Sequence, residues 1–234
     1  MPKTAYILAF AMAALVAPIS SASAQQTALI DPYFAAKLTL GFGGSASTSV
    51  EANGTTYSSD RSLQASVGVA GQYLYPLHDF FSVGGMLGIQ TWRSTADGDG
   101  GRNIVFDLAV LPQGKYVLIP NQLEVNVTIP IGLALDMLNE VDASNTLFRN
   151  GSGAAAGGKI EGNTALGLVV GALVGARYQV MDTFGLLLEL GYLYHSVGHT
   201  VTTSAMGGNL VSVSNDTDVS ISWGQFALNV GAYF

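Results

Sequence analysis

Residues 123–136 read Leu-Glu-Val-Asn-Val-Thr-Ile-Pro-Ile-Gly-Leu-Ala-Leu-Asp, and an apolar side chain stands at every odd position. The even positions carry Glu124, Asn126, Thr128 and Asp136 together with small residues and Pro130. Successive side chains of a β-strand point to opposite faces. The segment therefore predicts a strand with one apolar face and one polar face.

The same alternation recurs along the chain and predicts seven further strands. They lie at 33–43, 62–75, from 80 to about 90, 103–119, 164–180, 186–195 and from 219 to the end. The segment 103–119 is the least regular. Its two ends are expected to prefer different faces, and Pro112–Gly114 could itself form a turn.

The first 24 residues predict a secretory signal peptide. Lys3 precedes an apolar run from Ala5 to Ala17, and Ala22-Ser23-Ala24 is a small-residue cleavage site, with cutting expected after Ala24. A membrane anchor is the alternative, but the run is shorter than the roughly 20 residues that a spanning helix needs. The predicted mature domain is 25–234.

The composition is unusual for a water-soluble domain. Hydrophobic residues make up 49% of the chain and charged residues only 11%, against about 25% charged in typical soluble domains. No mature segment is a long enough apolar run for a spanning helix, and only helices and closed barrels satisfy their backbone in lipid. The sequence thus predicts an all-β fold, an eight-stranded antiparallel transmembrane up-and-down barrel. A β-sandwich or lipocalin-type cup is the soluble alternative.

The connections between the predicted strands alternate between short and long. Turns are expected at 76–79, 120–122 and 181–183, and long polar loops at 45–61, 93–102, 137–163 and 200–218. Short periplasmic turns and long outer loops are typical of bacterial outer-membrane barrels.

Aromatic residues are expected to form two girdles at the edges of the apolar band. The predicted girdle residues are Tyr73, Tyr75, Phe81, Trp92, Tyr116, Tyr178, Tyr192, Tyr194 and Trp223.

The chain ends in Phe226-Ala-Leu-Asn-Val-Gly-Ala-Tyr-Phe234. With the signal peptide, the eight strands and the absence of cysteine, this ending resembles the small outer-membrane β-barrel family of the OmpA-barrel and OmpX type. The resemblance implies localisation in the outer membrane, with its lipid and lipopolysaccharide as surroundings. It also implies that the barrel-assembly machinery reads the alternate face Phe226, Leu228, Val230, Ala232 and Phe234. Ala232 departs from the family, which often has a large residue there.

The parity of apolar residues changes within this last strand. Val219, Ile221 and Trp223 are odd-numbered, whereas the apolar set from Phe226 to Phe234 is even-numbered. If both sets face lipid, a β-bulge is required, and we expect it at Gly224–Gln225 because glycine in a strand often marks a bulge.

Charged residues on the predicted inner face should pair with one another, since eight strands leave room inside only for side chains. The set is Lys37, Asp107, Glu124, Asp136, Arg177 and Glu189. We expect salt bridges that plug the lumen; a gated pore or proton path is the alternative.

Little else in the sequence indicates chemistry. His195 and Ser196 suggest an outer-leaflet lipid hydrolase, but adjacent residues of a strand point to opposite faces. Asp97–Gly101 lacks the spaced carboxylates of a calcium loop, and no cofactor or metal site is predicted. Loss of Lys3 changes the net charge from −7 to −8, which argues against nucleic-acid binding.

The sequence therefore predicts a structural surface protein that presents acidic outer loops. A narrow porin-like channel is the alternative, and an enzyme is less favoured. Loops 45–61 and 137–163 are the candidate sites for an extracellular ligand, and their acids could also hold cations that bridge lipopolysaccharide.

Overall fold

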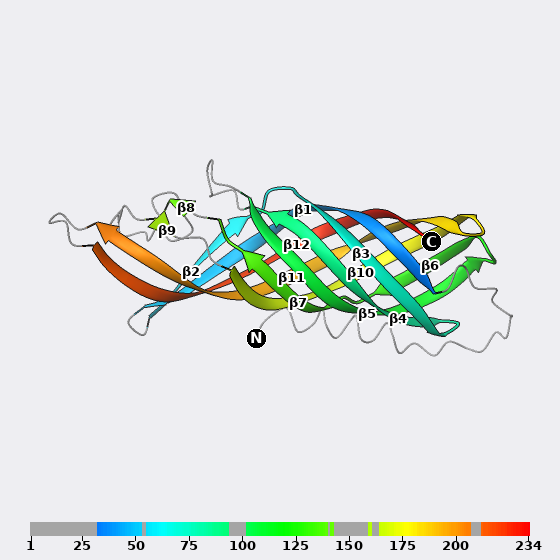
Figure 1. Ribbon diagram of the computed structural model, residues 1–234, viewed down its shortest axis with the longest axis horizontal. Coiled ribbons are helices and arrows are strands. Elements are labelled where there is room, and N and C mark those ends of the chain that lie inside the picture. The colour runs from blue at the N-terminus through cyan, green and yellow to red at the C-terminus, as the bar shows by residue number, and fades with distance from the viewer. Residues whose placement is uncertain are drawn as a thin grey trace.

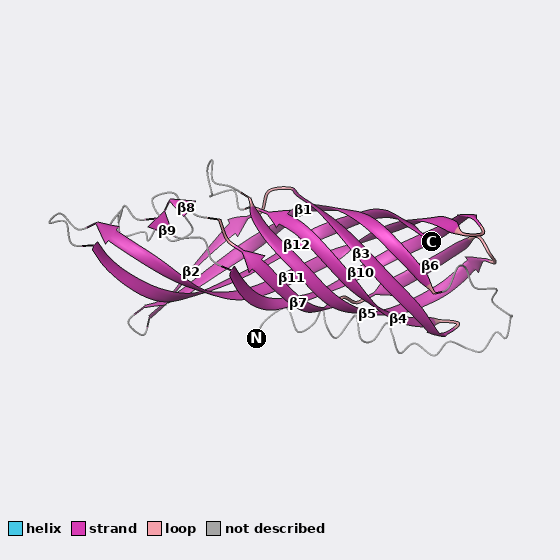
Figure 2. Ribbon diagram, viewed as in Figure 1, coloured by secondary structure: helices cyan, strands magenta, loops and turns pink. Residues whose placement is uncertain are grey.

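The computed structural model describes residues 32–52, 55–93, 102–139, 141–142, 159–160, 164–206 and 212–234. The predicted signal peptide, the Asp97–Gly101 segment and most of loop 137–163 lie outside these ranges. In the described parts, strands are joined by short turns (Figure 2), and no helix there is long and apolar enough to cross a membrane.

Twelve strands are assigned in the described residues. They are β1 (Tyr33–Ala52), β2 (Thr55–Ser62), β3 (Ser66–His78), β4 (Phe81–Trp92), β5 (Asn103–Ile119), β6 (Leu123–Thr128), β7 (Ile131–Met137), β8 (Val141–Asp142), β9 (Lys159–Ile160), β10 (Thr164–Met181), β11 (Phe184–Met206) and β12 (Ser212–Tyr233).

The long strands close into an antiparallel barrel with eight strand positions, which confirms the predicted fold (Figure 1). β6 and β7 together occupy one of these positions, paired on one side with β5 and on the other with β10. The first and last strands seal the ring, because Phe34 and Phe234 exchange both backbone hydrogen bonds at 2.9 Å. Closure leaves the barrel without a free sheet edge.

The side chains alternate as the sequence predicts, with the apolar set outside. Exposed large residues cover the outer wall, among them Leu38, Leu108, Leu133, Leu168 and Leu188. In β5 the even residues from Ile104 to Leu118 all face outward without interruption. The expected change of face and the possible turn at Pro112–Gly114 are therefore wrong.

Pro130 explains why one strand of the barrel is divided into β6 and β7. Pro130 has no N–H, so the ladder is interrupted between β6 and β7, yet inward and outward residues keep their parity across it. Ile129 donates its N–H to the carbonyl of Pro112 on β5. Pro112 therefore lies opposite Ile129, one position from Pro130, in the wall.

The predicted bulge exists at the expected height but in the neighbouring strand. The β1–β12 register shifts between Phe42 and Ser45, whereas β12 pairs with β11 without interruption. Gly43 and Gly44 have φ values of 63° and 99°, a region that glycine enters without steric cost. A Cβ on Gly44 would collide with the carbonyl of Gly224. The predicted bulge at Gly224–Gln225 is thus wrong.

Two of the predicted loops are largely strand. Segment 45–61 forms the outer half of β1 and most of β2, and segment 200–218 forms the ends of β11 and β12. β11 and β12 remain paired as far as Met206 and Ser212, about 45 Å of strand beyond Tyr192 at ~3.3 Å per residue. These hairpins extend beyond the barrel at the end opposite the C-terminus (Figure 1).

The short turns occur where the sequence predicts them. Only a few residues separate β3 from β4, β5 from β6 and β10 from β11, and Asn121 has a φ of 57° that its short side chain tolerates. Short turns mark the periplasmic end of an outer-membrane barrel, so the extended hairpins lie on the extracellular side.

Candidate functional site in the barrel lumen

Polar side chains form a ladder of hydrogen bonds inside the barrel. The lowest rung, near the periplasmic end, is a salt bridge between β10 and β6, where Arg177 and Glu124 are directly opposite cross-strand partners. Arg177 donates from Nε to Glu124 Oε1 at 2.9 Å and from Nη2 to Oε2 at 2.7 Å. Both side chains are fully buried. Such a bidentate pair is among the strongest polar contacts in proteins.

Two tyrosines flank this salt bridge. The Arg177 guanidinium carbon lies 4.1 Å from the ring centroid of Tyr33 and 5.2 Å from that of Tyr233. The two rings meet edge to face at 5.5 Å. Cation–π attraction strengthens when the cation is desolvated, so the rings stabilise the charge of Arg177 and narrow the lumen at the same level.

The next rung joins β1, β11 and β12. Lys37 Nζ donates to Glu189 Oε2 at 2.9 Å, and Asn229 Nδ2 donates to the same oxygen at 3.1 Å. Thr39 Oγ1 in turn donates to Asn229 Oδ1 at 2.8 Å. Each buried charge on this rung thus has a partner of opposite sign.

Asp107 and Asp136 pair with histidines rather than with lysine or arginine. His195 Nε2 lies 3.2 Å from Asp107 Oδ1, and His199 Nε2 lies 3.1 Å from Asp136 Oδ2. The sequence placed both carboxylates inside, but histidine partners were not predicted. The signal was present, since His195 and His199 share the parity of Glu189 along β11.

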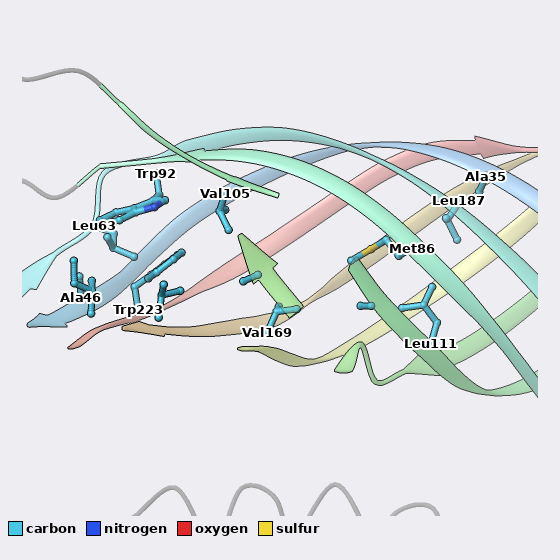
Figure 3. Close-up of a cluster of buried hydrophobic side chains, with 14 of the residues drawn as sticks. Ala35, Ala46, Leu63, Met86, Trp92, Val105, Leu111, Val169, Leu187 and Trp223 are labelled. Carbon is cyan, nitrogen blue, oxygen red and sulfur yellow. The ribbon is translucent and has the colours of Figure 1, made fainter. Parts of the chain in front are cut away.

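The two tryptophans lie in the lumen, not in a girdle. Trp92 and Trp223 are each 1% exposed and stack with ring centroids 4.6 Å apart (Figure 3). His195 stacks on the other face of Trp223 at 4.7 Å, and Trp92 Nε1 donates to Asp136 Oδ1 at 2.8 Å. The girdle assignment of Trp92 and Trp223 is therefore wrong.

Beside the two histidine–aspartate pairs, the outer part of the lumen holds a cluster of apolar side chains, which is why the sequence pattern misled. Val219 and Ile221 pack inside with Ala46, Val105 and the two tryptophans. Leu63, an apolar residue at the start of the predicted strand 62–75, is also buried in this cluster. From Val219 to Tyr233 the unbroken β12 sends its odd residues inward. The apolar residues Val219, Ile221 and Trp223 therefore face the lumen, and no slip is needed.

The remaining girdle residues face outward as expected. Tyr73, Tyr75, Tyr116, Tyr178, Tyr192 and Tyr194 are exposed, and Phe81 is partly exposed. On the last strand Phe226, Val230 and Phe234 are exposed, and Leu228 and Ala232 are partly so. That face lies outside the barrel, and its reading by assembly machinery stays a prediction.

The buried tryptophans give a direct optical prediction. Brominated acyl chains quench only tryptophans that touch lipid, so protein in brominated vesicles should keep nearly all of its fluorescence. A Phe226→Trp variant is the matched control, because Phe226 is 51% exposed on the outer face of the same strand, and its added emission should be strongly quenched. Equal quenching of the wild-type protein would contradict the lumenal placement.

The lumen holds little empty space. A cavity of about 20 Å³ lies beside Lys37, Thr39, Asp107 and Asn229, room for about one water molecule. A groove of about 920 Å³ on the wall is lined by residues such as Leu38, Val69, Leu87 and Leu108. Most of its lining side chains point outward to the lipid-facing surface, while Lys37 and Asp107 line it from the lumen side.

His195 and Ser196 do not form a catalytic pair. His195 is buried in the lumen beside Asp107, while Ser196 points away on the other face of β11. Among the residues that the structure describes, no group of three His, Asp or Glu side chains is arranged to hold a metal ion.

This fold and outer surface define the class of protein. A closed barrel with an apolar outer wall, short turns at one end and long hairpins at the other is a bacterial outer-membrane β-barrel.

Solved structures share the architecture at low sequence identity. The outer membrane protein OprG from Pseudomonas aeruginosa is 14% identical, with 88% of this chain and 97% of OprG covered and a TM-score of 0.52. The protease OmpT from Escherichia coli is 11% identical, with 90% and 99% covered and a TM-score of 0.46. Neisserial surface protein A is 10% identical, with 86% and 95% covered and a TM-score of 0.39. No family model and no curated protein matches the sequence.

Proposed function

We propose that this protein is a closed, non-conducting barrel that anchors a surface structure in the outer membrane. The supporting observation is the filled lumen. The Arg177–Glu124 bridge, the Lys37–Glu189 bridge and the Trp92–Trp223 stack follow one another along its axis. The two salt bridges link neighbouring or next-neighbour strands, whereas the tryptophan stack joins β4 to β12 across the lumen. Together these contacts block the path, and the stack also braces the wall.

The extended hairpins are what such a barrel presents. β2, β1, β12 and β11 continue as one sheet above the barrel, with Val50 paired to Val219 and Thr200 to Asp218. The exposed carboxylate of Asp60 and that of Asp218, which accepts a hydrogen bond from Thr200 Oγ1 at 2.9 Å, lie on this sheet. The proposed role is a rigid, acidic platform for contacts outside the cell, with no chemistry of its own.

A conductance measurement tests this function. Refolded protein in a planar bilayer should give no stepwise current above the lipid baseline, while a general porin in the same lipid gives clear steps. Reproducible steps that scale with the amount of protein, and that change in Glu124→Gln, would contradict the closed barrel.

A narrow channel is the second candidate, and one observation favours it. Several buried polar atoms in the lower lumen have no hydrogen-bond partner among the described residues, including Gln72 Oε1, Ser82 Oγ and both side-chain polar atoms of Asn126. Buried polar groups without partners are costly, and ordered water commonly satisfies them. A file of water there would begin a path that the Arg177 salt bridge interrupts. The same conductance measurement separates the two candidates.

A further inference from the structure

Basic side chains are distributed unevenly over the described residues. Lys37, Lys115 and Arg177 are buried inside the barrel. Three other Lys and Arg side chains have a described placement: Arg61 at the barrel-side end of β2, Arg93 just after β4 and Arg102 just before β5. The periplasmic turns at 79–80, 120–122 and 182–183 carry neither Lys nor Arg. Fixed positive charge outside the lumen thus lies at the extracellular rim.

Two of these arginines occupy neighbouring positions just beyond the β4–β5 ladder. The β4–β5 ladder ends with the pair Trp92 and Asn103, both buried inside. Arg93 and Arg102 are the next residues on each side, so alternation turns them outward. Arg102 Nη1 confirms this direction, because it donates to Ala65 O at 3.1 Å and approaches Thr91 Oγ1 at 3.5 Å.

The charges of this pair are not neutralised within the described part of the chain. Like charges directly opposite each other destabilise a sheet, and no acidic partner of Arg93 or Arg102 is found among the described residues. Arg93 Nε is buried without a hydrogen-bond partner. Guanidinium groups at two neighbouring positions suit a phosphate, because each can donate bidentate hydrogen bonds to phosphate oxygens.

The position of Arg93 and Arg102 relative to the apolar band indicates which phosphate groups they can reach. Phe106, exposed at the upper edge of the apolar band, lies four residues along β5 from Arg102. At ~3.3 Å per residue and a tilt of ~45°, the arginines stand about 9 Å above it. That is the level of lipid headgroups rather than of acyl chains or bulk water. The acidic chain as a whole would repel free anions, so attraction here is local.

We propose that Arg93 and Arg102 form a binding site for a phosphate monoester on the headgroup of the outer-leaflet glycolipid. The bound phosphate neutralises the facing guanidinium groups, and the acyl chains of the lipid lie along the apolar wall below. The site ties the rim of β4 and β5 to the outer leaflet and fixes the depth of the barrel. It depends on the outer-membrane fold and not on whether the lumen conducts.

The test measures binding of purified lipid A to the full barrel in detergent, by native mass spectrometry or thermophoresis. Arg93→Gln/Arg102→Gln should bind bisphosphorylated lipid A about 10- to 100-fold more weakly, which corresponds to about 1.4–2.7 kcal/mol in total. Arg61→Gln is the matched control. It removes the same charge at the same rim, but Arg61 is opposite the buried Ala46 and so lies on the inner face of the sheet.

Further arms separate the sources of phosphate and guard against misfolding. Dephosphorylated lipid A should bind wild type and double variant equally weakly, and millimolar inorganic phosphate should not displace lipid A from the wild type. Arg102→Lys, which keeps the charge but loses the fork, should be intermediate, and all variants should show the same heat-modifiable gel mobility. Equal affinity of wild type and double variant for bisphosphorylated lipid A would overturn the proposal. Displacement by millimolar inorganic phosphate would also overturn it, by showing a site for the free ion.

Discussion

Arg177→Met is expected to lower the free energy of unfolding by about 3–5 kcal/mol, the usual cost of leaving one member of a buried ion pair without its partner. Glu124 would keep its charge at a fully buried position and lose both of its hydrogen bonds from Arg177. The Tyr33 and Tyr233 rings would lose the cation they flank. Glu124→Gln should cost less, because those rings still stabilise the guanidinium.

The measurement is a urea titration in lipid vesicles, read as loss of heat-modifiable gel mobility. Arg177→Met/Glu124→Gln is the informative control. Removing both charges together should recover a large part of the loss, since an uncompensated buried charge is more costly than a neutral pair. Arg61→Met removes a cation at the rim and should change stability little. Unchanged midpoints in both single variants would show that the pair does not brace the barrel.

Much of the fold could be predicted because the membrane imposes a strict period on each strand. Residues 123–136 show it most clearly, and their parity survives the break at Pro130. Lipid demands apolar groups at every outward position within the band. The number of barrel strands and the lipid-facing side chains of the apolar band could therefore be predicted from the alternation. The short turns could be predicted from the residues between the alternating segments.

The prediction failed where the lumen itself is apolar. Trp223, Ile221 and Val219 are inward residues, whereas the sequence pattern assigns hydrophobic residues to the lipid side and so predicts a slip at Gly224. The odd or even position of a residue along the strand predicts its face better than its hydrophobicity does here. Trp223 is odd-numbered, like the inward residues Asn229 and Tyr233. The bulge lies in β1 instead, where two consecutive glycines allow positive φ. Outside the membrane the period no longer reports on lipid, so segments 45–61 and 200–218 were read as loops although they pair as strands.

The sequence predicts that charged residues pair inside the barrel, but it predicts only some of the partners. Buried acids need cations, and Lys37 and Arg177 were rightly placed with Glu189 and Glu124 inside. The partners of Asp107 and Asp136 depend on the stagger between strands far apart in the chain, which no local pattern reports. Histidine was overlooked because it is also an ordinary polar residue at a strand end.

Trp223→Ala is expected to lower the free energy of unfolding by about 3–5 kcal/mol, the range for truncating a large buried aromatic residue to alanine. Trp223 lies between Trp92 and His195 in one stack, so its removal leaves a cavity bounded by two rings that lose their partner. Trp223→Phe retains much of the volume and should lose less than half as much. A girdle tryptophan would behave differently, because lipid and water fill the space it leaves.

The second readout is near-ultraviolet circular dichroism, where two indoles 4.6 Å apart should couple in the wild type and lose that signal in both variants. Iodide should then quench Trp92 more strongly in Trp223→Ala than in the wild type, because water enters the opened mouth. A loss below about 1 kcal/mol with an unaltered dichroism spectrum would contradict the stack, and with it the closed extracellular end of the barrel.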